Sequence, residues 1–158
     1  MLSASVALWF IVVYSARVAF LGNPLYRMVE QADATLLARV EAATTGDLNE
    51  VTEDELRFLR RFSRLGMLEM LMVAVELVVF SALWWADVVP MPSLMLFLKN
   101  VAMLGLSIVL AYVHMADGVF GALLALPKWV ALTDRASASV SAAGALLILL
   151  IVNDVALW

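Results

Sequence analysis

The sequence has no cysteine and a single histidine, and charged residues make up only 15% of its 158 residues. Without cysteine, the chain has no disulfides, no thiolate metal site and no thiol redox chemistry. The low share of charge stands beside 65% hydrophobic residues. An ordinary soluble domain is about 25% charged and about 45–50% apolar, so a water-soluble globule is excluded. Disorder is excluded as well, because disordered chains are poor in large apolar side chains.

The sequence contains no long block of consecutive basic residues, and acidic residues outnumber basic ones. The chain has 10 Lys plus Arg against 14 Asp plus Glu, a net charge of −4. Proteins that bind nucleic acid carry a basic patch or stripe. We therefore expect no nucleic-acid partner.

What the sequence does contain is long apolar runs. Runs of about 20 residues match the hydrocarbon thickness of a bilayer when they are helical. Four can be identified, at about residues 2–21, 66–86, 94–116 and 136–156. They predict an all-α membrane protein in contact with the lipid bilayer, a four-transmembrane-helix bundle that forms a single membrane domain over residues 1–158. The apolar but Gly- and Pro-containing piece around Gly118 and Pro127 predicts a frayed helix end, then an interfacial turn or short helix.

Most of the charge lies between the first two runs, where residues 22–65 hold 14 of the 24 charged residues. Asn23-Pro24 has the pattern of a helix start, a capping side chain followed by proline at the first helical position. Helical spacing of apolar residues then continues to about Ala43. Thr52 and Glu55 have the spacing of a capping box and start a second helix, which we expect to run directly into the second span. The sequence predicts a cytoplasmic helical hairpin.

The orientation follows from the Lys and Arg content of the short loops, which is highest on the cytoplasmic side. Residues 22–65 carry six arginines, and the connection before the fourth run carries Lys128 and Arg135. The loop between the second and third runs has no basic residue. We predict a bacterial-type inner (plasma) membrane protein with both termini outside.

The third run carries a stripe of polar and polarisable residues. At 100° per residue its members fall within an arc of about 80°, the width of one helix face. Ionisable residues inside spans are costly and face the bundle interior or a wet cavity, which makes them candidates for function. The stripe consists of Lys99, Met103, Ser107, His114 and Asp117.

Other spans add ionisable groups, and two interpretations stay open. Arg17–Glu69 and Lys99–Asp154 pairs would only hold the helices in register, and this leaves Glu76 near the midplane unexplained. Alternatively, the polar groups line a path for a proton, a metal ion or a cofactor. This predicted relay comprises Arg17, Glu69, Glu76, Lys99, Ser107, His114, Asp117 and Asp154.

The single histidine restricts metal chemistry. His/Met ligation of haem is chemically allowed, and thioethers suit Cu(I), so copper and haem are the candidate cofactors. The candidate metal ligands are His114 and Met103, with Met70, Met72 and Met115 as alternative methionines. Ser137, Ser141 and Gly144 form a small-residue face on the fourth span. Such faces let membrane helices approach closely, so we expect packing there, inside the bundle or between subunits.

Three segments follow one another in the order ARVAFLGNPLYR, LRRFSRLGMLEMLMV and LFLKNVAMLGLSIVLAYVH. This arrangement resembles the four-helix unit of copper-resistance-D-like membrane proteins and of the membrane-embedded protoporphyrinogen-oxidase family. Both families have a lysine near the start of the third span, where Lys99 lies, and the latter has a histidine near its end, where His114 lies. Both typically place a histidine in the first span, where this chain has only Arg17 as an ionisable group.

Three functions compete. The resemblance and the buried polar groups favour handling or transport of a small cation or metal. The second hypothesis is a non-catalytic accessory subunit that packs into a larger membrane complex or a homo-oligomer. The third is a haem- or porphyrin-related membrane enzyme. No residue pattern identifies a catalytic group, so we favour a role that is not enzymatic.

Overall fold

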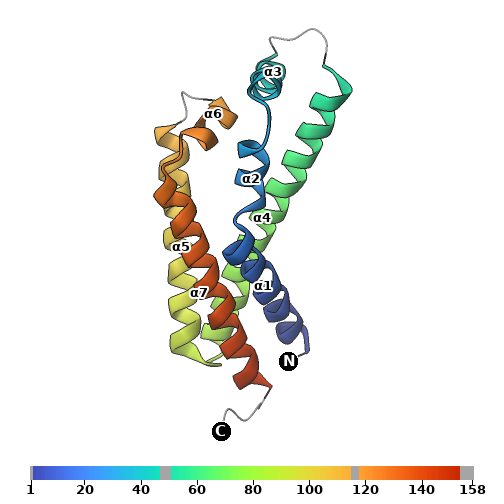
Figure 1. Ribbon diagram of the computed structural model, residues 1–158. Helices are drawn as coiled ribbons and strands as arrows, with labels where there is room; N and C mark the ends of the chain where they lie inside the picture. The colour runs from blue at the N-terminus through green and yellow to red at the C-terminus, as the bar shows by residue number, and fades with distance from the viewer. Residues whose placement is uncertain (1, 47–50, 115–117, 154–158) are drawn as a thin grey trace.

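The computed structural model describes residues 2–46, 51–114 and 118–153 (Figure 1). Within these ranges the chain is helical and contains no strand. The helices are α1 (Leu2–Leu21), α2 (Pro24–Glu30), α3 (Ala34–Thr45), α4 (Glu53–Trp85), α5 (Pro90–Val113), α6 (Gly118–Ala125) and α7 (Lys128–Val152).

Four long helices form the body of the molecule, and the prediction of an all-α bundle is confirmed to that extent. The helical segments 4–30, 53–85, 90–113 and 128–152 are each long and apolar enough to cross a membrane. α1 packs mainly against α7, and α4 packs mainly against α5. α3 and α6 lie together at one end, while α1 begins and α7 ends near the opposite end (Figure 1).

The third and fourth long helices begin earlier than the sequence predicted, at Pro90 instead of residue 94 and at Lys128 instead of residue 136. Pro90 occupies the first position of α5, where its missing N–H costs no hydrogen bond. α7 continues through Asp134 and Arg135, residues that an apolar-run criterion places outside a span. These earlier starts move the midpoints of both helices.

The first half of the predicted hairpin is two helices instead of one. Asn23 caps α2 as expected, and its side chain accepts the Leu25 N–H at 2.9 Å. α2 then stops at Glu30, and Asp33 caps a new helix by accepting the Thr35 hydroxyl at 2.6 Å and its N–H at 3.4 Å. Asp side chains compete for backbone N–H groups in this way, and the apolar periodicity does not report it.

The second half of the hairpin agrees with the prediction. The Thr52 N–H donates to Glu55 Oε2 at 2.7 Å, completing the capping box. α4 then continues without a break for 33 residues. Glu55 Oε1 also lies 2.6 Å from Arg39 Nε, which ties α3 to the start of α4.

The hairpin docks on α6, the short helix predicted after the third span. Glu41 accepts the N–H groups of Val119 at 2.9 Å and Phe120 at 3.0 Å, so an α3 carboxylate caps the N-terminus of α6. Gly118 precedes them with φ of +74°, and a Cβ there would collide with the Glu41 carboxylate. Phe120 packs edge-on against Phe62 with ring centroids 5.0 Å apart. The hairpin and the connection before α7 therefore meet at the same end of the bundle.

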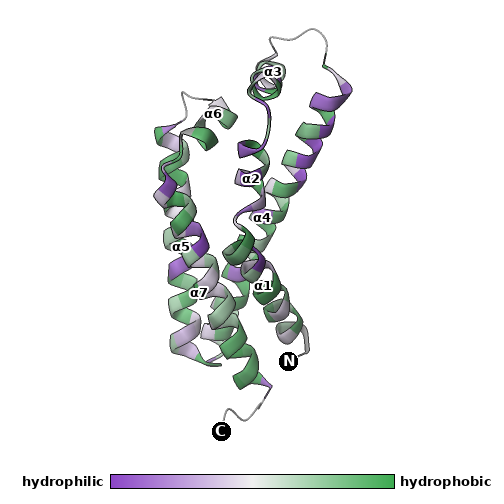
Figure 2. Cartoon of the chain, viewed as in Figure 1, coloured by the Kyte–Doolittle hydropathy of each residue, from purple (hydrophilic) through white to green (hydrophobic). Residues whose placement is uncertain are grey.

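The opposite half of the bundle has a buried apolar core. Gly144 lies where α7 meets α5, and a Cβ there would come within 2.7 Å of Leu96 Cδ1, as a close-packing face requires. Hydrophobic side chains also cover the outer surfaces of the long helices, whereas polar residues gather on the hairpin end of α4 (Figure 2). The core residues are Leu8, Ile11, Met72, Phe80, Leu83, Leu96, Ala145, Ile148 and Leu149.

Candidate functional site

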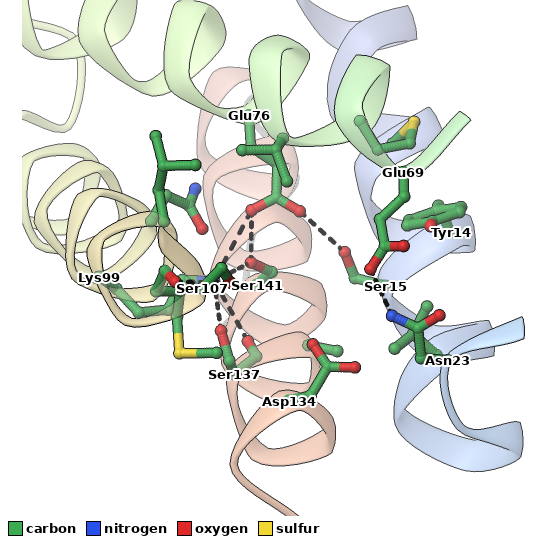
Figure 3. Close-up of a pocket in the computed structure, with 17 residues that line it drawn as sticks. Tyr14, Ser15, Asn23, Glu69, Glu76, Lys99, Ser107, Asp134, Ser137 and Ser141 are labelled. Carbon is green, nitrogen blue, oxygen red and sulfur yellow. Dashed lines mark hydrogen bonds and ion pairs between the residues drawn. The ribbon is translucent and has the colours of Figure 1, made fainter. Parts of the chain in front are cut away.

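A polar cavity of about 130 Å³ lies where the four long helices meet (Figure 3). Each helix contributes polar side chains to its wall, which is unusual in a chain this apolar. Ionisable groups at such a position are expected to serve function. Its polar lining residues are Tyr14, Ser15, Asn23, Glu69, Glu76, Lys99, Asn100, Ser107, Asp134, Ser137 and Ser141.

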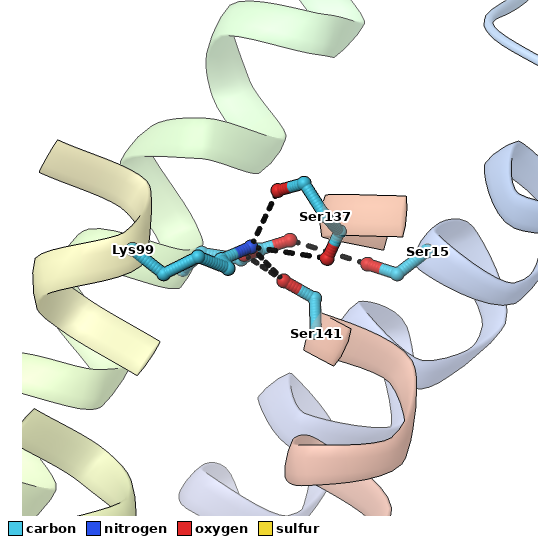
Figure 4. A network of polar contacts seen from close by, with 5 residues as sticks. Ser15, Lys99, Ser137 and Ser141 are labelled. Carbon is cyan, nitrogen blue, oxygen red and sulfur yellow. Dashed lines mark hydrogen bonds and ion pairs between the residues drawn. The ribbon is translucent and has the colours of Figure 1, made fainter. Parts of the chain in front are cut away.

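The centre of this cavity is an ion pair between α4 and α5. Lys99 Nζ lies 3.7 Å from Glu76 Oε2. Ser141 connects the two groups, since Lys99 Nζ donates to Ser141 Oγ at 2.5 Å and Ser141 Oγ donates to Glu76 Oε2 at 2.7 Å. Lys99 also donates to Ser137 Oγ at 3.1 Å and to Ser137 O at 3.3 Å (Figure 4).

α1 completes the network. Ser15 Oγ donates to Glu76 Oε1 at 3.2 Å, so each carboxylate oxygen of Glu76 accepts a hydroxyl. The network depends on helix periodicity, because Ser137 and Ser141 are four residues apart and face the same side of α7. Glu76, Ser141 and Ser15 are buried, at 8%, 1% and 2% exposure. We call Ser15, Glu76, Lys99, Ser137 and Ser141 the relay cluster.

Two further carboxylates, Glu69 and Asp134, line the same cavity, and neither forms an ion pair with another described residue. Glu69 Oε1 accepts the side-chain amide of Asn23. Asp134 Oδ2 is buried and accepts no hydrogen bond. Among the residues that the structure describes in this cavity, three carboxylates therefore face one amine, that of Lys99. An unpaired buried charge is costly, so such carboxylates take up a proton or bind a cation.

A larger cleft of about 710 Å³ adjoins the cavity on the hairpin side. Glu69, Met103, Ser107 and Asp134 line both spaces, so the polar cavity forms the inner end of the cleft. The wall of the cleft is mainly apolar and comes from α2, α3, α4, α5, α6 and the start of α7. His114 lines the cleft at the end of α5, beyond the polar cavity.

The predicted stripe on the third span faces this interior. Lys99, Met103 and Ser107 line the polar cavity, and Met103, Ser107 and His114 line the cleft. Asp117, the last member of the stripe, lies outside the described residues. The periodicity of α5 therefore identified the face that borders the two spaces.

The predicted partners of the buried charges differ from those observed. Arg17 is exposed and forms no ion pair with Glu69 in the described part of the chain, because Glu69 turns to Asn23 instead. Lys99 reaches Glu76 and the serines of α7. The predicted partner Asp154 lies outside the described residues. The predicted pair assumed that Lys99 lies level with the end of the fourth run, whereas α5 and α7 begin earlier than predicted and Lys99 lies level with Ser137 and Ser141.

Sequence reasoning missed several members of the site. The sequence analysis does not single out Asp134, which precedes the predicted fourth span, whereas the structure includes it in α7. Ser137 and Ser141 were interpreted as a packing face, although their spacing also fits two hydroxyls aimed at one charge. Ser15 and Asn23 carried no signal of their own, since a single polar residue in a span or at a cap has many uses.

The proposed metal ligands lie far apart. Met103 and His114 are 11 residues apart on one helix, which is about 16 Å of rise. Two side chains and metal bonds of roughly 2 Å do not bridge that length. Within the described residues, no group of three or more His, Cys, Asp or Glu side chains is placed to hold a metal ion. The donor set does not fit a resident copper or haem at His114 and Met103.

Comparison of the chain with known protein families, with characterised proteins and with solved structures finds no match.

Proposed function

We propose that this chain is a multi-pass membrane protein that takes up protons, or another small cation, from the hairpin side and passes them through the relay cluster. The observation that carries the proposal is the imbalance of charge in the polar cavity, where three carboxylates face one amine among the described residues. Buried carboxylates in excess of their cationic partners bind positive charge.

Insertion in a bilayer is supported by the four long apolar helices and by their surfaces. Large hydrophobic side chains on all four are exposed, including Phe20 at 84%, Met70 at 75% and Trp85 at 87%. Exposure of this kind is stable in lipid and unstable in water. The Lys and Arg bias supports an orientation with the hairpin in the cytoplasm and both ends of the chain outside, and we propose a bacterial-type inner membrane as the location.

Proton movement needs groups that both donate and accept hydrogen bonds. The hydroxyls of Ser15 and Ser141 do both, and they contact the two oxygens of Glu76. The Lys99 amine competes with an arriving cation, because both bind beside Glu76 Oε2. The relay cluster thus combines a binding carboxylate with a tethered amine that returns when the cation leaves.

Among the described residues, the cleft opens the polar cavity toward the hairpin side. Beyond Glu76, the apolar core formed by side chains such as Leu8, Phe80 and Ile148 is fully buried. Release on the far side therefore requires α1, α4, α5 and α7 to separate around this core, as expected of a transporter with alternating access.

The experiment is proton uptake into liposomes that contain the purified protein and a trapped pH indicator, driven by a potassium diffusion potential. Wild type should acidify the lumen faster than empty liposomes. Glu76→Gln should reduce uptake at least tenfold, and Glu76→Asp should restore part of it. Glu53→Gln, which alters a carboxylate that is 78% exposed, is the matched control.

Equal uptake by Glu76→Gln and wild type would exclude Glu76 as a relay. The same liposomes tested with sodium, potassium and copper separate a proton from other cations. If wild type moves none of these ions and instead co-purifies with a stoichiometric membrane partner, the accessory-subunit hypothesis replaces the present one.

A further inference from the structure

We propose that the 710 Å³ cleft binds an amphipathic organic cation, with its apolar body along α5 and α6 and its positive head between Glu69 and Asp134. This names a ligand and a binding site beyond the ion movement proposed above. It does not require that Glu76 conduct anything, because the two carboxylates concerned lie outside the relay cluster.

The size and wall of the cleft suit a small organic molecule. Ligand pockets for such molecules are mainly apolar and measure roughly 300–1,000 Å³. The side facing α5 and α6 presents Leu106, Leu110, Ala122, Leu123 and Leu126. A hydrated metal ion gains nothing from such a wall, whereas an aliphatic or aromatic body buries its surface there.

The inner end of the cleft selects for positive charge. Glu69 and Asp134 lie there, and neither has an ion-pair partner among the described residues. Asp134 Oδ2 is buried with no hydrogen-bond donor, so a bound cation would supply the missing interaction. An anion would be repelled by both carboxylates, and a neutral ligand would leave their charge uncompensated.

Lys99 does not cancel this preference. Its Nζ is held by Glu76 at 3.7 Å and by the hydroxyls of Ser137 and Ser141. The amine therefore pairs first with Glu76, and its additional attraction to Asp134 still leaves an excess of negative charge at the inner end of the cleft.

Two aromatic side chains on the cleft wall add to the selection. Tyr26 of α2 and Phe62 of α4 both line the cleft. The Phe62 ring is held in place by its edge contact with Phe120, at 5.0 Å between centroids. Aromatic faces attract ammonium and guanidinium groups, which favours a cation over a neutral molecule of the same shape.

The test uses probes that differ in one property each. Tetraphenylphosphonium and tetraphenylborate have the same shape and opposite charge, and tetramethylammonium has the charge without the apolar body. Equilibrium dialysis of the full chain in detergent, with empty micelles subtracted, should show saturable binding of tetraphenylphosphonium. The borate and the small ammonium should each bind at least tenfold more weakly. Equal binding of the phosphonium and the borate would overturn the proposal, and this comparison needs no variant.

Variants then locate the site. Glu69→Gln with Asp134→Asn should weaken tetraphenylphosphonium binding at least tenfold, while Glu53→Gln should leave it unchanged. Unchanged binding in the double variant would also overturn the proposal. Binding of tetraphenylphosphonium by the wild-type chain is measured without any proton uptake, so failure of this proposal and failure of the proposed function are separate results.

Discussion

The Glu76–Lys99 pair offers a quantitative test of how the buried charges contribute to stability. Lys99 Nζ and Glu76 Oε2 are 3.7 Å apart, with side-chain exposures of 20% and 11%. At an effective dielectric constant of about 20, two unit charges at that distance attract by roughly 4.5 kcal/mol. Removing one partner of a buried pair costs about 3–5 kcal/mol because the other charge is stranded, whereas removing both is nearly neutral.

We therefore expect Glu76→Gln and Lys99→Met each to lower the free energy of unfolding by about 3 kcal/mol, and the double variant to lose much less than their sum. The coupling energy should be at least about 2 kcal/mol. Reversible unfolding in mixed micelles of increasing SDS content measures all four proteins. Gln retains the capacity to bond with Ser15 and Ser141, so the comparison isolates charge from hydrogen bonding.

The control is the surface pair Arg57–Glu53, whose atoms are closer, at 3.3 Å, but whose side chains are 66% and 78% exposed. Exposed pairs four residues apart on a helix contribute about 0.3–0.5 kcal/mol. If distance alone decided the matter, the surface pair would couple more strongly. If the coupling energy of the buried pair is no larger than that of the surface pair, the reasoning is refuted. Glu76 and Lys99 would then interact as two solvated charges.

Two further predictions concern the hairpin end. Gly118→Ala should destabilise the protein by about 1–2 kcal/mol, because φ of +74° disfavours a side chain and the new Cβ meets Glu41. Gly105 has open space around it, so Gly105→Ala should be neutral or stabilising in the same unfolding assay. Hydrogen bonds from Thr35 lower the pKa of Asp33, so the stability that this cap contributes is present above the ordinary Asp pKa and is lost as the pH falls through the lowered value. Thermal unfolding at pH 7 and about pH 3 should therefore show wild type losing stability relative to Asp33→Asn on acidification, and parallel curves would contradict this.

Local signals predicted much of the fold. The four apolar runs correspond to the four long helices, because a helix of about 20 apolar residues is recognisable from composition alone. The caps at Asn23 and at Thr52 with Glu55 were equally predictable, since capping depends on residues within three positions of each other. The break at Asp33 was missed because the apolar spacing continues across it.

The sequence predicted several residues of the site but not the contacts between them. The face of α5 that carries Lys99, Met103 and Ser107 follows from helical periodicity, and it does line the cavity. The pairing of Lys99 with Glu76 does not follow, because it depends on how far α4 and α5 are shifted along each other. A shift of one turn moves a side chain by about 5.4 Å and exchanges its partners.

The sequence by itself determined the class of protein, the number of long apolar helices and the polar face of α5, because composition and helical period are properties of single segments. The tertiary structure alone decided that Ser15 and Ser141 serve one carboxylate, and that Asp134 shares a cavity with Glu69. These contacts join residues more than 60 positions apart, so they depend on the relative depth of packed helices. The same packing leaves three carboxylates facing one amine within the described part of the cavity, and the proposed function rests on that arrangement.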